Sequence, residues 1–181
     1  STAIILSSLL RLYSKKTPVH VLFICVDHIH VELLRQQCLT MGAAVPELSV
    51  IPQISRGINI RPHHLQQGRN IFICTPGKAI NLCERAQSKH VAAKNLFVEH
   101  LLSVTVFDSD SLLTEPLFNK LKSTFRYIPV TINVNFVSNS FCDEMKTRII
   151  SHQLVDFESE KCKKHMFDYN HDNLKFWFVF C

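Results

Sequence analysis

Residues 104–113, VTVFDSDSLL, decide the fold, because an apolar run in them leads directly into a short acidic turn. The run ends at Phe107, Asp108 and Asp110 form the turn, and apolar side chains resume at Leu112. This pattern predicts a buried strand followed by a polar turn. Open α/β sheets place their ligand chemistry at the carboxyl ends of their strands. Asp108 and Asp110 are therefore the first candidate site residues.

Further apolar runs alternate with segments of helical periodicity along the chain. Asp27 is expected to cap one helix and Gly42 to end it, while Pro76 is expected to open the next. The alternation predicts crossover connections, and hence an α/β fold with a mostly parallel sheet and helices on both faces. Strands are predicted at 19–26, 48–51, 70–74, 102–107, 130–137 and 154–157, helices at 2–13, 29–41, 76–85, 115–125 and 143–152, and a helical turn at 59–67.

The composition limits the class of protein. A chain of 181 residues suits one domain, and 46% hydrophobic residues are enough for a core. No apolar run approaches the roughly 18 residues of a membrane span, so no membrane partner is expected. A net charge of +5 permits a polyanionic partner. The seven cysteines form no Cys-x-x-Cys pair, and Cys25 and Cys74 sit in apolar runs, which predicts buried thiols in a reducing, cytoplasmic compartment.

Three short motifs each follow a predicted strand, in a fixed order: TPGK at 75–78, FDSD at 107–110 and SNS at 138–140. This order resembles the first RecA-like (P-loop NTPase-like) domain of DEAD-box RNA helicases. In that family, Thr-Pro-Gly-Arg, Asp-Glu-Ala-Asp and Ser-Ala-Thr motifs occupy these places. The resemblance covers residues 1–157. Residues 158–181 are predicted to be a linker and the start of a following segment.

The resemblance also implies roles for individual residues. Asp108 and Asp110 would belong to a degenerate acidic motif, and Thr2 would be a hydroxyl that holds magnesium just after the family's phosphate loop. Ser138 and Ser140 would couple the acidic motif to RNA binding. The residues that would contact RNA are Thr75, Pro76, Gly77 and Lys78.

Departures from the family argue against hydrolysis of ATP. The family's phosphate loop is missing, Phe107 replaces the Asp that would hold magnesium, and Asp108 is one methylene shorter than the Glu that would activate water. Magnesium prefers oxygen ligands, and phosphoryl transfer depends on positioning and charge neutralisation. ATP and magnesium are therefore expected only if a phosphate loop precedes Ser1. Otherwise Asp108 is expected to cap the helix that follows it, with a weak nucleotide site as the alternative.

RNA binding needs less machinery than hydrolysis. Backbone N–H groups at a helix N-terminus favour a phosphate, Gly77 permits close approach, and Lys78 adds charge. The alternative is that Pro76 only starts a helix. Four further cations would extend the basic face: Arg56, Arg61, Lys89 and Lys94.

The sequence therefore predicts a degenerate helicase-like domain that binds RNA without efficient ATP hydrolysis. It would be part of a larger protein of RNA metabolism, and it is similar to the helicase-like domains of Tudor-domain proteins in the piRNA pathway. A cytoplasmic RNA granule is a compatible location. The expected partners are RNA and a second RecA-like domain or another protein. Two alternatives remain: a fragment of an active ATP-dependent RNA helicase, and a protein-interaction scaffold.

Two further expectations concern metal binding and the ends of the fold. No metal site is expected, because the spacing of the C-terminal cysteines and histidines matches no standard zinc pattern. The family's missing phosphate-loop strand predicts a gap or an exposed strand edge in the sheet. The apolar end at 174–181 is expected either to pack back on the domain or to begin a segment that lies beyond it. The cysteines and histidines in question are Cys162, His165, His171 and Cys181.

Overall fold

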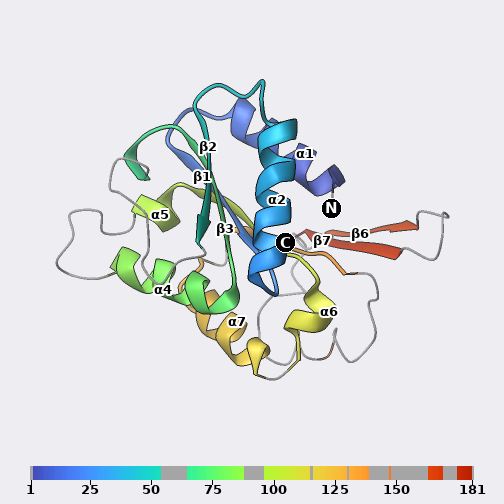
Figure 1. Cartoon of the computed structure of the whole chain (residues 1–181). Coiled ribbons are helices and arrows are strands. Elements are labelled where there is room, and N and C mark those ends of the chain that lie inside the picture. The colour runs from blue at the N-terminus through green and yellow to red at the C-terminus, as the bar shows by residue number, and fades with distance from the viewer. Residues whose placement is uncertain are drawn as a thin grey trace.

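A five-stranded sheet lies between two layers of helices in the computed structural model of the chain (Figure 1). The strand order is β2-β3-β1-β4-β5, and every neighbouring pair is parallel. The predicted α/β class with a mostly parallel sheet is therefore confirmed. The structure describes residues 2–53, 65–87, 96–114, 116–129, 131–138, 147, 163–168 and 175–180.

The elements follow one another in the order that the sequence predicts. The strands of the large sheet are β1 (Val19–Ile24), β2 (Leu48–Gln53), β3 (Arg69–Cys74), β4 (Leu101–Val106) and β5 (Asn133–Phe136). The helices are α1 (Thr2–Ser14), α2 (His28–Met41), α4 (Pro76–Gln87), α5 (Leu96–Glu99), α6 (Ser109–Leu112) and α7 (Leu117–Phe125).

The central strand β1 is buried along its whole length, as expected for a strand that helices cover on both faces. Its register aligns Ile24 with Cys74 of β3 and with Val106 of β4. The three strands consequently end at the same level. The turns that follow them are brought to one edge of the sheet.

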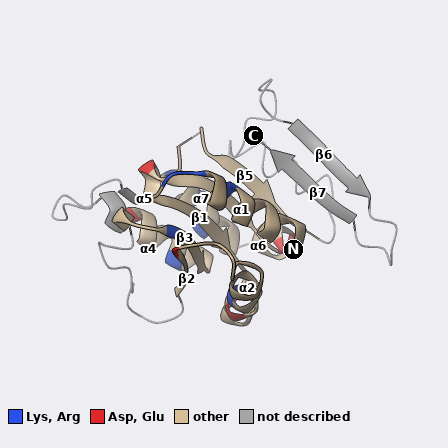
Figure 2. Cartoon of the chain, turned by 90° about the horizontal axis from the view of Figure 1, so that it is seen from above, with Lys and Arg blue, Asp and Glu red and all other residues tan. Residues whose placement is uncertain are grey.

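Each helical layer buries its own hydrophobic core against the sheet. Figure 2 looks onto the edge of the sheet and shows α1 and α2 on one side and α4, α5 and α7 on the other. Phe23, Cys25 and Cys38 belong to the α1/α2 core, whereas Cys74 and Cys83 belong to the α4/α7 core. Burial raises the pKa of Cys38 and of Cys83 to about 12, and it raises the pKa of Cys25 and of Cys74 as well. The predicted buried thiols, Cys25 and Cys74, are thus confirmed as free and buried.

Helix α2 has the ends that the sequence predicts. Its N-cap, Asp27, accepts a hydrogen bond from the backbone N–H of His30 at 2.9 Å. At its other end Gly42 donates its N–H to the carbonyl of Cys38 at 2.9 Å. A Cβ on Gly42 would lie 2.6 Å from that same carbonyl oxygen and would also meet the Leu48 side chain, so close packing requires glycine here.

Helix α1 is closed by a side chain that is distant in sequence. Arg69, the first residue of β3, donates from Nε to the carbonyl of Leu12 at 2.8 Å and from a terminal nitrogen to the carbonyl of Lys15 at 3.2 Å. These bonds satisfy carbonyls that a helix C-terminus leaves without intrahelical partners. They also tie α1 to the start of the strand beneath it.

Several boundaries differ from the prediction. Strand β5 spans Asn133–Phe136 and is shorter than the predicted 130–137, because the residues before it form a turn. Helix α6 was not predicted, since four residues are too few to produce a helical period. The prediction at 154–157, and most of those at 143–152 and 59–67, lie outside the described residues.

An antiparallel hairpin, β6 (Lys163–Asp168) and β7 (Lys175–Phe180), forms a second sheet. Strand β5 is the edge of the large sheet, and β7 comes close to it. Because β7 lies near this edge, the expected gap or exposed edge stays a prediction, and the apolar end lies close to the large sheet. Part of the stretch that was predicted to be a linker forms strand β6, which pairs with β7. The predicted end of the RecA-like domain at residue 157 stays a prediction. Within the described ranges, no helix combines the length and the apolar character needed to cross a membrane.

Candidate nucleic-acid interface

Backbone hydrogen bonds hold the polar turns together at the carboxyl edge of the sheet. The N–H of Cys25 donates to the carbonyl of Cys74 at 2.9 Å, and the N–H of Phe107 donates to the carbonyl of Ile24 at 2.9 Å. On the other side of β4, the N–H of Val137 donates to the carbonyl of Val106 at 2.8 Å. The strand pairing therefore continues into the turns, and the three sequence motifs begin at one edge.

Phe107 lies in the hydrophobic core. Only 4% of its surface is exposed, and its ring meets Phe23 edge to face, with the centroids 5.2 Å apart. In the DEAD-box pattern this is the position of a carboxylate that holds magnesium. A benzene ring offers no oxygen to a hard cation, so this position does not fit the metal. Among the described residues, no group of three or more His, Cys, Asp or Glu is placed to hold a metal ion.

Asp108 has an unusual backbone and an unexpected neighbour. Its φ of 50° and ψ of 47° place it in the left-handed region, which Asp tolerates better than most residues. It occupies the N-cap position of α6, but its side chain makes no capping hydrogen bond within the part of the chain that the structure describes. The prediction that Asp108 caps this helix is therefore wrong. A left-handed N-cap turns the carboxylate away from the first N–H groups of the helix.

The carboxylate of Asp108 lies beside the ring of His30, with Oδ2 3.8 Å from Nε2. The other ring nitrogen of His30, Nδ1, is 2.8 Å from Oδ1 of Asp27. Hydrogen bonds from the backbone and the ring of His30 lower the pKa of Asp27. His30 thus connects the cap of α2 to the acidic turn. The sequence analysis missed this residue, because the contact joins segments far apart in the chain.

Ser109 connects the acidic turn to the end of β5. Its backbone N–H and its hydroxyl both donate to the carbonyl of Val137, at 2.9 Å and 3.1 Å. Ser109 is fully buried, and so is nearly all of Ser138. The sequence analysis assigned the coupling to the hydroxyls of Ser138 and Ser140. Ser138 lies at this junction, Ser140 lies outside the described residues, and Ser109 is the hydroxyl that was missed.

The TPGK motif forms the first turn of α4. Pro76 is the first helical residue, and the N–H groups of Lys78 and Ala79 each donate to the carbonyl of Thr75 at 2.9 Å. The space above Gly77 would admit a Cβ without a clash. A Cβ placed on it would meet Cδ of Lys120 at 3.9 Å, an ordinary contact.

Lys120 reaches this helix start from α7, which packs against α4. A second cation therefore lies beside Gly77, in addition to Lys78 of the motif itself. Sequence reasoning did not identify Lys120, because only the packing of α7 on α4 brings it there. The four further cations that were predicted to extend this face lie outside the described residues: Arg56, Arg61, Lys89 and Lys94.

Two other predicted site residues lie on separate helices. Thr2 is the first residue of α1 and is exposed, and Asp110 is half-buried in the first turn of α6. A carboxylate in a first turn is favoured by the partial positive charge of the helix N-terminus. The roles proposed for these two residues stay predictions.

This arrangement of sheet, helices and motif-bearing turns is the fold of a RecA-like domain of DEAD-box helicases. One solved structure with this fold is S. cerevisiae Dbp5 bound to RNA and ADP BeF3, with a TM-score of 0.65 and 15% sequence identity over 86% of this chain and 36% of that chain. A Dbp5 variant bound to Nup159, a Gle1 variant, IP6 and ADP gives a TM-score of 0.62, with 15% identity over 83% of this chain and 38% of that chain. The DEAD-box helicase Mss116 bound to ssRNA and UDP-BeF gives 0.62, with 13% identity over 84% of this chain and 31% of that chain.

The resemblance drawn from the motifs is thus confirmed at the level of the fold. The chain spans between 31% and 38% of the length of these structures. No protein-family model and no curated protein sequence matches the chain.

Proposed function

We propose that the chain is a degenerate DEAD-box-like RecA domain that binds the RNA backbone without efficient ATP hydrolysis. One observation carries this proposal: at the first turn of α4, the side chain of Lys120 is the one group within contact distance of a Cβ placed on Gly77, among the described residues. The domain would act in a larger cytoplasmic protein of RNA metabolism, for which the piRNA pathway is a candidate. A second RecA-like domain or another protein partner would complete the binding surface.

The chemistry of this helix start suits a phosphate. A helix N-terminus carries partial positive charge that favours an anion, and glycine permits close approach of the anion to the backbone. Lys78 and Lys120 add point charges without reading bases, so binding would not depend on sequence. Solved structures of the same fold, Dbp5 and Mss116, were bound to RNA, which supports this ligand class. A single domain would bind weakly, because the family holds RNA between two domains.

The acidic turn supports the loss of hydrolysis. Phosphoryl transfer depends on metal ions that neutralise the developing charge, and the carboxylate that would hold one is replaced by Phe107. Asp108, at the position of the water-activating Glu, lies beside His30. The residues present therefore suit a domain that binds RNA without using ATP to release it.

RNA binding can be tested by fluorescence anisotropy with a labelled single-stranded oligouridine at several salt concentrations. Affinity should fall steeply with salt, and Lys78→Glu should weaken binding and reduce the slope of log K against log salt by about 0.7 for each lost phosphate contact. Lys16→Glu is the matched control, because it makes the same charge change at an exposed lysine that follows α1.

Three outcomes would contradict the proposal. Equal weakening by Lys78→Glu and Lys16→Glu would show attraction to net charge without a site. Absent or salt-insensitive binding would favour the protein-interaction scaffold. RNA-stimulated ATP hydrolysis by the intact protein at ordinary helicase rates would favour the active helicase.

A further inference from the structure

The exposed face of α1 carries an apolar stripe. Among the residues whose side chains are described, every large exposed hydrophobic residue lies on α1 or α2. Single exposed hydrophobic residues are common and need no explanation. On α1 they recur at helical spacing, at Leu6, Leu10 and Tyr13, with 45%, 69% and 59% of their surfaces exposed. We call these three residues the α1 stripe.

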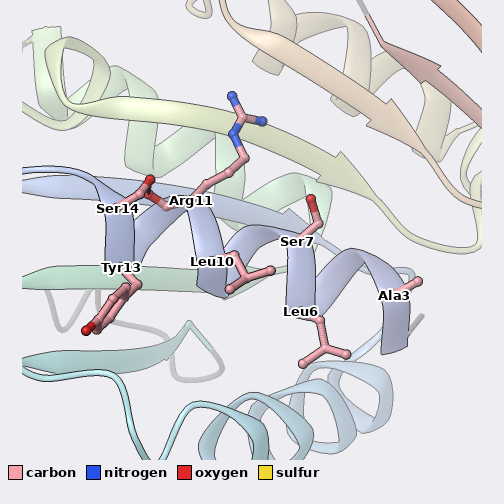
Figure 3. Close-up of a pocket in the computed structure, with 7 residues that line it drawn as sticks. All are labelled: Ala3, Leu6, Ser7, Leu10, Arg11, Tyr13 and Ser14. Carbon is pink, nitrogen blue, oxygen red and sulfur yellow. Dashed lines mark hydrogen bonds between the residues drawn. The ribbon is translucent and has the colours of Figure 1, made fainter.

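The α1 stripe borders a shallow hollow. Figure 3 shows Leu6 and Tyr13 projecting to one side of the helix, and Ser7 and Arg11 projecting to the other. Small residues at this surface leave room for side chains of a partner. The opposite face of α1 is used already, because it packs in the core beneath the helix. Among the described residues, the stripe belongs to neither hydrophobic core cluster.

The charged side chains of α1 and of the residues just after it have one sign. Residues 1–26 contain no Asp or Glu, so α1 has no acidic side chain of its own. Arg11 lines the hollow, and Lys15 and Lys16 are exposed just beyond the Tyr13 end. A complementary partner would present apolar side chains along the stripe and carboxylates at that end.

We propose that the α1 stripe binds an amphipathic helix of a partner protein, with acidic residues placed opposite Lys15 and Lys16. Anchors at helical spacing on such a helix match the spacing of the stripe. A second copy of this chain is a poor occupant. If the α1 helices of two copies packed in parallel, their lysines would lie together. If they packed antiparallel, the lysines of each copy would face the N-terminus of the other α1, which has partial positive charge and no carboxylate.

The test uses the full chain and a synthetic helical peptide of about 18 residues, a length that can form a helix in water. The first peptide, called the Glu peptide, carries Leu at helical spacing on one face and three Glu at one end. The second, called the Lys peptide, has Lys in place of the three Glu. Titration with fluorescent peptides should show preferential binding of the Glu peptide. Leu10→Asp should weaken that binding at least about tenfold, as for an anchor at the centre of an interface. The double variant Lys15→Glu/Lys16→Glu should bind the Lys peptide in preference.

Asn81→Asp is the matched control, because it adds the same charge at an exposed position of α4 in the other helical layer. It should leave peptide binding unchanged. Thermal melting of each variant checks that the fold is intact. At 69% exposure, Leu10 is a position where Asp should leave the fold intact.

Four results would overturn the inference: equal affinity for both peptides, no loss with Leu10→Asp, equal loss with Asn81→Asp, or no peptide binding at all. A dimer in sedimentation equilibrium that Leu10→Asp dissociates would assign the stripe to self-association instead. Binding to vesicles of phosphatidylserine and phosphatidylcholine that depends on Leu10, without peptide binding, would assign it to a membrane surface.

Discussion

Replacing Phe107 with Asp, the residue of the DEAD-box pattern, should destabilise the domain without creating a metal site. Phe107 is 4% exposed, and its ring packs on Phe23 with the centroids 5.2 Å apart. Truncation of a buried Phe to Ala costs about 3–5 kcal/mol. A carboxyl group in that cavity adds a desolvation cost, which a raised pKa relieves only in part. We therefore expect Phe107→Asp to lower the free energy of unfolding by at least about 3 kcal/mol, which is a large share of the 5–15 kcal/mol typical of a domain.

Urea unfolding followed by circular dichroism at pH 7 measures this change. Phe107→Leu is the control, because it keeps an apolar side chain in the cavity and should cost less. Each variant is unfolded again in 10 mM MgCl2, roughly the concentration at which a millimolar site would stabilise the native state by mass action. We expect magnesium to leave the unfolding midpoint of Phe107→Asp where it was.

The reasoning would be refuted if Phe107→Asp were as stable as the original chain. It would also be refuted if magnesium raised the unfolding midpoint of this variant and left that of Phe107→Leu unchanged. The first result would mean that the buried ring contributes little to stability, and the second would mean that this position still faces a metal pocket.

Three further predictions concern residues with distinct environments. Burial lowers the pKa of His20 from 6.5 to about 4, so the unfolded chain takes up the proton first as pH falls. The contribution of His20 to the free energy of unfolding should be constant above pH 6.5 and should decline by about 3 kcal/mol toward pH 4. Urea unfolding at several pH values measures this decline, which should be smaller for His20→Gln. Gly77→Ala should leave the free energy of unfolding equal or raise it by about 0.5–1 kcal/mol, because a Cβ fits at this position of the helix. The same variant should weaken the binding of oligouridine, measured by fluorescence anisotropy, if a phosphate approaches this backbone. Gly42→Ala should cost about 1–3 kcal/mol in thermal or urea unfolding, because its Cβ would lie 2.6 Å from the Cys38 carbonyl oxygen. A loss of stability in Gly77→Ala, or none in Gly42→Ala, would contradict these two readings.

Local sequence signals predicted the strands of the large sheet and the ends of α2, but not the hairpin of β6 and β7. The apolar run at 19–26 indicated β1 because a strand covered on both faces needs no polar alternation. Asp27 and Gly42 marked the ends of α2 because capping depends on residues within one turn of the helix. These features depend on residues that are close together in the chain, so a single sequence is enough to predict them.

Contacts between distant segments could not be predicted in the same way. The approach of His30 to Asp108 depends on the register of β1 with β4, and Lys120 reaches Gly77 only because α7 packs on α4. The failure at Asp108 has a local cause: cap preference describes residue type, whereas the left-handed backbone at this position redirects the side chain. Helix α6 is too short for periodicity to reveal it.

Four of the seven cysteines are buried thiols in the described part of the chain, and they can report the opening of the folded domain. A thiol whose pKa is raised reacts slowly with alkylating reagents, because the thiolate is the reactive species. Cys25 and Cys38 belong to the core formed with α1 and α2, whereas Cys74 and Cys83 belong to the core formed with α4 and α7. Mass spectrometry of timed alkylation would therefore time the exposure of each helical layer separately, and it would reveal whether one layer detaches while the other still protects its pair.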